Sequence, residues 1–198
     1  YRRYLWERNQ EIRQKWQQGQ SAEQLAEAYC LSEDSIRKIA YKKEEPILDY
    51  ECSLQCAKAF AKAGRLEDWV HAYLLSDGDN PAFSHGLKLF DRFFLGPANM
   101  PLSLFHRCCG PEETMKWRVH PVHFENKVAR LKEAIQNDPD MPPLIVSYRF
   151  SEVDGSPEFE LNDGNGRFEA YKRLGYEHVH VIFWITEPEE LADFQDKY

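Results

Sequence analysis

This chain of 198 residues contains no long apolar run and no low-complexity tract. No stretch approaches the roughly 18–20 apolar residues that a membrane span needs. The first ten residues, YRRYLWERNQ, include basic side chains but no following apolar segment, so we expect no secretory signal. These absences indicate an ordinary globular protein without a membrane partner.

The cysteines are too few and too irregularly spaced for a disulfide framework. We expect all five to be reduced thiols in a cytoplasmic protein: Cys30, Cys52, Cys56, Cys108 and Cys109. Cys52 and Cys56 lie one helical turn apart, but a zinc site usually needs a second ligand pair, which the sequence does not offer. We therefore expect no metal site.

Charge is distributed unevenly around the net value of −8. Residues 1–43 hold nine Lys and Arg against six Asp and Glu, a balance of +3. The remainder holds sixteen against twenty-seven, a balance of −11. Because nucleic acid is a polyanion, any contact with it would fall to the basic N-terminal part.

Residues 8–43 have the pattern of three short helices. Ser21 begins a capping box with Gln24 at the second helix, and Ser32 caps the third. The apolar positions have the spacing of a helix-turn-helix unit: Leu25, Ala26, Leu31, Ile36 and Ile39. The pattern resembles the trihelical units of many bacterial regulators, with Cys30 at the turn position that glycine usually occupies.

Polar and basic residues of the third helix would face outward in such a unit. On DNA they would meet phosphates or base edges: Ser35, Arg37, Lys38, Lys42 and Lys43. Glu33 and Asp34 oppose this interpretation because they lie near the helix end that normally enters the groove, although acidic residues also suit a helix N-terminus. A structural or protein-docking role is the open alternative.

The middle of the chain has a helical pattern between two boundaries. Glu44–Pro46 ends the basic part, and Gly96–Pro97 marks the entry to the last part. Between them, apolar residues recur at helical spacing. We expect three parts: a helix-turn-helix unit at 1–45, a helical connector at 46–96 and an α+β domain at 97–198.

The stretch from Leu161 to Gly175, LNDGNGRFEAYKRLG, reads as a strand, a glycine-rich turn and a helix. A β-rich run from Val179 to Ile185 follows it. A glycine-rich turn of this kind exposes backbone N–H groups at a helix N-terminus, which favours a bound phosphate or carboxylate. Such turns also occur without a ligand. His178 and His180 alternate in the second strand, so they share one face.

The sequence DGNGRFEAYKRLG resembles the signature of the ParB/sulfiredoxin superfamily, in which a G-x-x-R turn opens a helix and contacts nucleotide phosphates. Residues 164–170 are similar to the sulfiredoxin form G-C-H-R-Y-E-A and, more loosely, to the ParB form G-E-R-R. Residues 115–119 resemble the first ParB box, residues 124–137 form an amphipathic helix, and residues 141–146 resemble the P-P-I-x-V strand. The resemblance covers roughly residues 100–190 and implies a mixed-sheet domain of the ParB/sulfiredoxin fold.

The resemblance implies a cradle for a nucleotide such as CTP, ATP or ADP, with Mg²⁺ as an optional companion. Gly164, Asn165 and Gly166 would present backbone amides to the phosphates. Arg167 would neutralise phosphate charge, and Arg118 would close the site from the first box.

Carboxylates near the turn would complete the site. Asp163 would hold magnesium or fix the turn, and Glu112 and Glu113 would serve as general base or magnesium ligands, with ordinary loop solvation as the alternative. Two departures limit the resemblance. Asn165 stands where sulfiredoxins have their catalytic cysteine, which excludes sulfinic-acid reduction, and Gly166 stands where many relatives have a histidine.

Three functions are compatible with these residues. The first is a bacterial or phage-type DNA-associated protein whose ParB-like domain binds a nucleotide or phosphate. The second is a nucleotide-dependent kinase of a small molecule such as an amino acid. The third is a nuclease, which we rank last because the sequence lacks the carboxylate cluster of two-metal cleavage. Whether the protein is an enzyme and whether it forms a homodimer both stay open.

Overall fold

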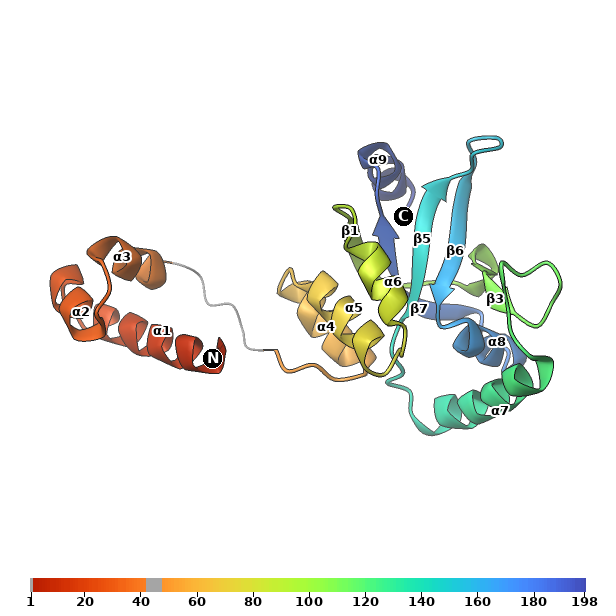
Figure 1. Cartoon of the computed structure of the whole chain (residues 1–198), viewed down its shortest axis with the longest axis horizontal. Helices are drawn as coiled ribbons and strands as arrows, with labels where there is room; N and C mark the ends of the chain where they lie inside the picture. Colours follow the sequence, from red (N-terminus) through yellow and green to blue (C-terminus); the bar gives the residue numbers. More distant parts are fainter. Residues whose placement is uncertain (1, 42–47) are drawn as a thin grey trace. The chain divides into compact units, whose positions relative to one another are not determined.

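Two compact units make up the chain, Tyr1–Ile47 and Leu48–Tyr198, and each is described by itself (Figure 1). The structure, a computed structural model, describes residues 2–41 and 48–198. Within those ranges, no helix combines the length and the hydropathy that crossing a bilayer requires.

The first unit consists of three helices around a small apolar core. They are α1 (Arg2–Gln17), α2 (Ala22–Tyr29) and α3 (Glu33–Tyr41). Ile12, Leu25 and Ile36 are fully buried between them. The capping box at the start of α2 is confirmed, because the Ser21 hydroxyl accepts from the Gln24 amide and the Gln24 side chain accepts from the Ser21 amide. The apolar register expected from the sequence therefore forms the core of this unit.

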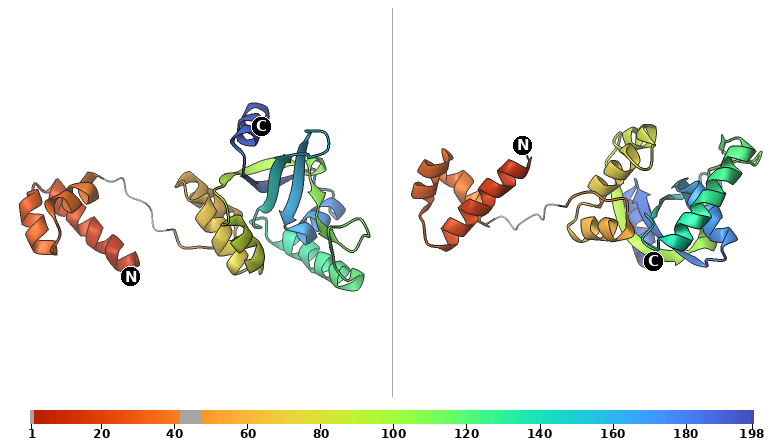
Figure 2. Two further views of the ribbon diagram at one scale, coloured as in Figure 1. Left: turned by 45° about the horizontal axis from the view of Figure 1, so that its top comes forward. Right: turned by 90° about the horizontal axis from the view of Figure 1, so that it is seen from below.

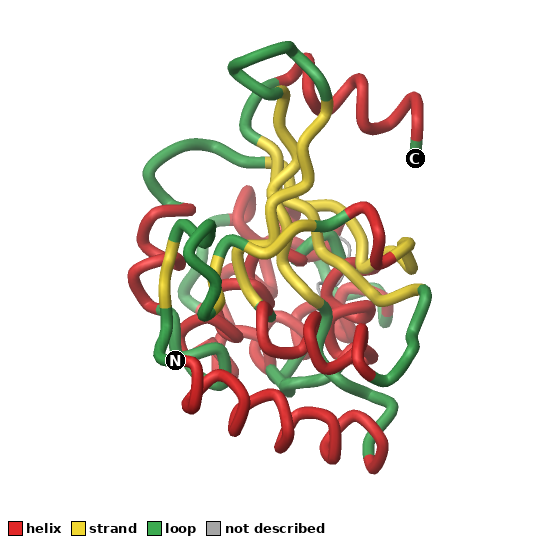
Figure 3. The backbone as a smooth tube through the Cα atoms, turned by 90° about the vertical axis from the view of Figure 1, so that its right-hand side faces the viewer, coloured by secondary structure: helices red, strands yellow, loops and turns green. Residues whose placement is uncertain are grey.

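A mixed five-stranded sheet forms the centre of the second unit, in the order β1-β7-β5-β6-β2. Neighbouring pairs alternate in direction: β1 is antiparallel to β7, β7 is parallel to β5, β5 is antiparallel to β6, and β6 is parallel to β2. The bounds are Phe93–Pro101 for β1, His106–Arg107 for β2, Leu144–Phe150 for β5, Pro157–Asp163 for β6 and His178–Ile185 for β7. Figure 3 shows these strands as one twisted layer with helices around it.

Both faces of this sheet are buried. Successive residues of a strand point to opposite faces, and in the central strands both sets are packed in a core. Ile145 and Ile182 lie in a core shared with α4 (Leu54–Lys62), α5 (Leu66–Leu75) and α6 (Pro81–Leu87). Val146 and Phe183 lie in a second core, shared with residues of α8 (Asn165–Arg173) and α9 (Pro188–Lys197).

Helix α7 (Pro121–Asn137) forms an outer layer on α8 rather than on the sheet (Figure 2). Phe124 and Val128 of α7 pack against Ala170 of α8. The segment between β1 and α7 contains a short 3₁₀ turn, Leu102–Leu104, and a two-stranded ladder of β3 (Cys109–Gly110) and β4 (Trp117–Arg118). This ladder contacts α8 and so reaches the expected phosphate turn.

The α+β class expected from the sequence is confirmed, with three N-terminal helices followed by further helices and a mixed sheet. Residues 46–96, expected as a connector, contribute α4, α5, α6 and the first residues of β1. These helices share a core with the sheet, so the second compact unit includes them. The three-part division of the chain stays a prediction.

Cys30 adopts a left-handed backbone conformation, with φ of +52°, at the turn between α2 and α3. A Cβ in this conformation costs about 1–2 kcal/mol. Changing Cys30 to Gly should therefore stabilise the first unit by about 0.5–1 kcal/mol, after allowance for the flexibility that glycine adds to the unfolded chain. Hydrogen exchange at the α2 and α3 amides measures the change. Cys30→Ala retains the Cβ and should give no such gain; equal stabilisation by both variants would contradict the strain.

Candidate functional site

The N-terminus of α8 is the structural centre of the phosphate turn. Gly164 is its N-cap with φ of +91°, and a Cβ on this residue would lie 2.5 Å from Cδ2 of Leu144. Only glycine meets both constraints. The Phe168 amide makes the first helical bond, at 2.8 Å to the Gly164 carbonyl, so the preceding amides of Asn165, Gly166 and Arg167 have no helical acceptor. These N–H groups and the helix dipole favour an anion.

The sequence predicted that Arg167 would extend toward a bound phosphate. In the structure its side chain turns into the core instead. Its side chain is 6% exposed. One terminal nitrogen, Nη1, donates to the carbonyls of Pro142 and Pro143. The other, Nη2, donates to the Tyr73 hydroxyl at 2.7 Å and to Asp163 at 3.0 Å. Both terminal nitrogens of the guanidinium are therefore engaged by the protein itself.

Tyr73 and Asp163 complete this buried cluster. The Tyr73 hydroxyl accepts from Arg167 and donates to the Asp163 carboxylate at 2.9 Å. Burial raises the pKa of Tyr73, so the hydroxyl stays protonated and retains its donor. Asp163, expected to hold magnesium or to fix the turn, contacts Arg167 and Tyr73, an arrangement that fixes the end of β6 to the first turn of α8.

Asn165 joins the turn to the β3–β4 ladder. Its side-chain oxygen accepts from the Cys109 amide at 3.1 Å, and its amide nitrogen lies 3.9 Å from the Cys108 sulfur. An amide is a stronger acceptor and a stronger donor than a thiol, whose sulfur accepts and donates only weakly. Gly166 faces α7: a Cβ there would lie 3.0 Å from Leu131 and 3.5 Å from the side chain of Lys127. The missing side chain is therefore also what lets α7 approach α8 closely.

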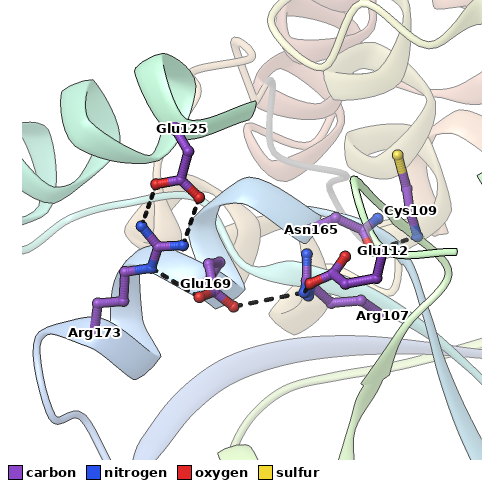
Figure 4. A network of polar contacts seen from close by, with 7 residues as sticks. All are labelled: Arg107, Cys109, Glu112, Glu125, Asn165, Glu169 and Arg173. Atoms are coloured by element: carbon purple, nitrogen blue, oxygen red, sulfur yellow. Dashed lines mark hydrogen bonds and ion pairs between the residues drawn. The ribbon is translucent and has the colours of Figure 1, made fainter. Parts of the chain in front are cut away.

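Arg107, at the end of β2, is a further cation near the phosphate turn, and it lies outside the G-x-x-R motif. Its side chain is 9% exposed, and Nη2 pairs with Glu112 and lies 3.7 Å from Glu169 (Figure 4). The guanidinium carbon lies 5.0 Å from the centre of the Phe124 ring. Its other terminal nitrogen, Nη1, is buried and has no hydrogen-bond acceptor among the described residues. Because a buried N–H group without an acceptor is costly, Nη1 marks a position for an oxygen from outside the chain.

Lys127 and Arg107 both act on the thiol of Cys109. Burial raises the pKa of Cys109, and the two cations oppose that rise. The thiol, the two cations and the free amides of α8 therefore lie around one region. Glu169 extends the network from there, since it pairs with Arg173 at 2.8 Å, and Arg173 holds Glu125 through two nitrogens at 2.6 and 2.8 Å (Figure 4).

The two glutamates expected as catalytic groups differ in their surroundings. Partial burial of Glu112 acts to raise its pKa, but hydrogen bonds from its own backbone and from Arg107 outweigh it, so the pKa is lowered. A carboxylate held by an arginine in this way is a weak proton acceptor. Glu113 is exposed. Arg118 is also exposed, in β4 beside Gly110, and makes no side-chain ion pair among the described residues.

The outward face of α3 contains acids and bases in pairs. Arg37 contacts Glu33 at 2.6 Å and Lys38 contacts Asp34 at 3.4 Å, each one turn away. The Ser35 hydroxyl lies 2.9 Å from that of Ser32. Lys42 and Lys43 lie outside the described residues. DNA contact by this helix stays a prediction, and it would require phosphates to compete with these exposed pairs.

A metal centre has no ready position in the part of the chain that the structure describes. No three His, Cys, Asp or Glu side chains in residues 2–41 and 48–198 are placed to hold one. Asp163 is engaged by Arg167 and Tyr73, and Glu112 by Arg107. Mg²⁺ would therefore have to enter with the phosphates of a bound nucleotide, and it stays a prediction.

No family model and no curated protein matches this chain. Among solved structures, it is similar to the C-terminally truncated chromosome-partitioning protein ParB from Caulobacter crescentus in complex with CTP-gamma-S, with a TM-score of 0.34, 16% identity and coverage of 49% of this chain and 48% of that one. It is also similar to a Pnob8-like ParB-N domain, with a TM-score of 0.33, 14% identity and coverage of 52% of this chain and 34% of that one. A third similar structure is sulfiredoxin from Arabidopsis thaliana, with a TM-score of 0.31, 22% identity and coverage of 54% of this chain and 99% of that one.

The chain thus covers about half of the first ParB chain and a third of the second. TM-scores below 0.5 do not support a functional inference. Sequence reasoning identified the turn but missed Arg107 and Lys127. Neither belongs to the quoted motif, and both reach α8 only through the folding of β2 and α7 around it.

Replacement of Arg167 by alanine should destabilise the second unit by about 3–5 kcal/mol, because it leaves Asp163 without its cationic partner and two buried carbonyls without their donor. Hydrogen exchange at the β5 and β7 amides measures the loss. Arg173→Ala is the matched control: its pairs are more exposed, so we expect a change of less than about 1 kcal/mol. Similar stabilities of the two variants would mean that the buried cluster does not hold the turn.

Proposed function

We propose that the second unit binds a nucleotide or a related phosphate-bearing anion at the N-terminus of α8, and that the trihelical unit associates the protein with DNA. The observation that supports the first part best is the buried Nη1 of Arg107, which has no acceptor among the described residues. It lies beside Gly110, the residue that pairs with Arg118 across the β3–β4 ladder. A phosphate oxygen is an acceptor with the right charge for such a group.

The binding arrangement uses donors from five residues of this chain. The amides of Asn165 and Gly166 would donate to phosphate oxygens, Arg107 would supply Nη1, and the exposed Lys127 would add a positive charge. Arg118, which is exposed, would close over the outer phosphates as the motif implies. Arg167 contributes by fixing the turn, since its own donors are engaged in the core. CTP, ATP and ADP are the nucleotides to compare, each with and without Mg²⁺.

Binding, rather than phosphoryl transfer, fits the carboxylates better. A kinase would need a general base near the phosphates. Glu112 has a lowered pKa and is held by Arg107, so it is poorly suited to this task. We therefore favour a nucleotide-responsive DNA-associated protein, whose two units provide the two activities.

Replacement of Arg107 by glutamine should weaken CTP or ATP binding by about 1.5–3 kcal/mol, roughly tenfold to a hundredfold, because the variant cannot make a charge-assisted hydrogen bond to phosphate. Isothermal titration of the full chain measures this. Arg149→Gln removes one positive charge from β5 and is the matched control, which should bind like the wild type. An Arg107 variant that folds and binds both nucleotides normally would exclude this arginine from the site.

If α3 contacts DNA, neutralising the basic and the acidic members of its ion pairs should change DNA affinity in opposite directions. Changing Arg37 and Lys38 to Gln should weaken binding and lower the salt slope by about one for each phosphate that is no longer neutralised. Changing Glu33 to Gln and Asp34 to Asn should strengthen binding, because the competing carboxylates are removed. Fluorescence anisotropy with a DNA duplex at several salt concentrations measures both effects.

The control for the acidic pair is Glu23→Gln with Glu27→Gln, which makes the same charge change on α2. If α3 contacts the duplex, the α2 variant should strengthen binding less than the α3 variant does. Equal effects of both, or no binding by the wild type at moderate salt, would favour the structural or protein-docking role of the trihelical unit.

A further inference from the structure

A cavity of about 240 Å³ lies at the other end of α8, away from the phosphate turn. It opens where β7 begins, beside the end of β1, the turn after α8 and the C-terminus of α7. The residues that matter for its chemistry are Asn99, Asp138, Tyr171, Tyr176, His178 and His180. Helix α8 has nine residues and rises about 1.5 Å per residue, so the two ends are about 13 Å apart. The cavity shares Pro142 with the buried cluster around Arg167, but none of the groups proposed to bind phosphate lines it.

The C-terminus of α7 supplies a negative potential to this cavity. The last helical bond runs from the Asp138 amide to the Ala134 carbonyl at 2.9 Å. The next carbonyl, of Ile135, would need a donor from residue 139, but Pro139 has no N–H group. The Asp140 amide, which would serve the carbonyl after that, donates instead to the Asp138 side chain at 2.8 Å. The final turn therefore has carbonyl oxygens without a helical donor.

Asp138 increases this negative potential instead of balancing it. Helix C-termini are stabilised by Lys, Arg or protonated His, but the last turn of α7 contains no basic residue, and Asp138 is its C-cap. One carboxylate oxygen, Oδ1, accepts from Asp140, and the other has no hydrogen bond among the described residues. A carboxylate and a helix C-terminus that face the same cavity together create a site for a positive charge.

Aromatic and apolar side chains form the walls next to this charge. The rings of Tyr171 and Tyr176 meet edge to face with centres 5.2 Å apart. Ile135 and Met141 also line the cavity. Tyrosine rings attract cations through their faces, and they bury apolar groups at the same time. The walls thus suit an organic cation with an apolar body better than a hydrated metal ion.

Two imidazoles and an amide lie on the sheet side of the cavity. His178 and His180 alternate in β7, so they face the same way, and Asn99 of β1 pairs with His180 across the ladder. Burial, and then the nearby charge of Lys58, lower the pKa of His180. Its imidazole is therefore uncharged near neutral pH, and it can accept a hydrogen bond from a ligand without repelling a cation.

We propose that this cavity binds a small organic cation, with an ammonium group at Asp138 and the C-terminus of α7 and an apolar or aromatic body against Tyr171 and Tyr176. The imidazole of His180 accepts a hydrogen bond from the ammonium. The site is independent of the phosphate turn at the opposite end of α8.

Benzylamine and benzyl alcohol are matched probes for this site, because they share shape and differ in charge. Isothermal titration of the full chain at pH 7.5 should detect benzylamine binding at millimolar concentration, with benzyl alcohol at least about tenfold weaker, the factor that 1.4 kcal/mol of charge-assisted bonding supplies. Benzoate, with the opposite charge, should not bind. Equal binding of amine and alcohol, tighter binding of benzoate, or no binding of the amine would each overturn the proposal.

Two variants locate the binding. Asp138→Asn retains an oxygen for the Asp140 amide but removes the charge, and should weaken benzylamine about tenfold. Glu152→Gln, in the turn between β5 and β6, makes the same change of net charge elsewhere and should bind like the wild type. Arg107→Gln should also leave benzylamine binding unchanged, which separates this site from the nucleotide proposal. Unaltered affinity in Asp138→Asn would overturn the assignment.

Discussion

A single buried guanidinium holds the phosphate turn in place. Arg167 connects the first turn of α8 to Tyr73 of α5, to the carbonyls before β5 and to Asp163 at the end of β6. Three segments that are far apart in the sequence therefore meet at one side chain. Because a buried charge is tolerated only with partners, this cluster permits one arrangement of the turn and disfavours others. The amides of the first turn of α8 that have no helical acceptor owe their direction to it.

The function we infer depends on two groups of cations with different roles, one that holds the turn and one that would bind the ligand. Arg167 fixes the helix start from the core, whereas Arg107 and Lys127 would supply charge to the ligand, since the buried Nη1 of Arg107 has no acceptor among the described residues. The absent side chain of Gly166 lets α7 lie close enough for Lys127 to take part. Asn165 holds the turn against the β3–β4 ladder, since its side-chain oxygen accepts from the Cys109 amide of β3.

Local sequence patterns predicted most of the fold. Three features could be predicted from the sequence because each depends on residues that are close in the chain. They are the capping box at Ser21, the glycine turn at Gly164 and the alternating strands. The inward direction of Arg167 and the position of Arg107 were not predictable in this way. Both depend on contacts with residues distant in the sequence, such as Tyr73 for Arg167 and Glu169 for Arg107, and charge alone does not tell an inward arginine from an outward one.

The central claim is that a nucleotide phosphate binds at the first turn of α8 beside Arg107. Titration of the ¹⁵N-labelled full chain with CTP or ATP, followed by amide and arginine side-chain NMR signals, tests it most directly. We expect the largest shifts at the amides of Asn165, Gly166 and Arg167 and at the Arg107 guanidinium. Shifts confined to other parts of the chain, or none at millimolar nucleotide, would contradict it.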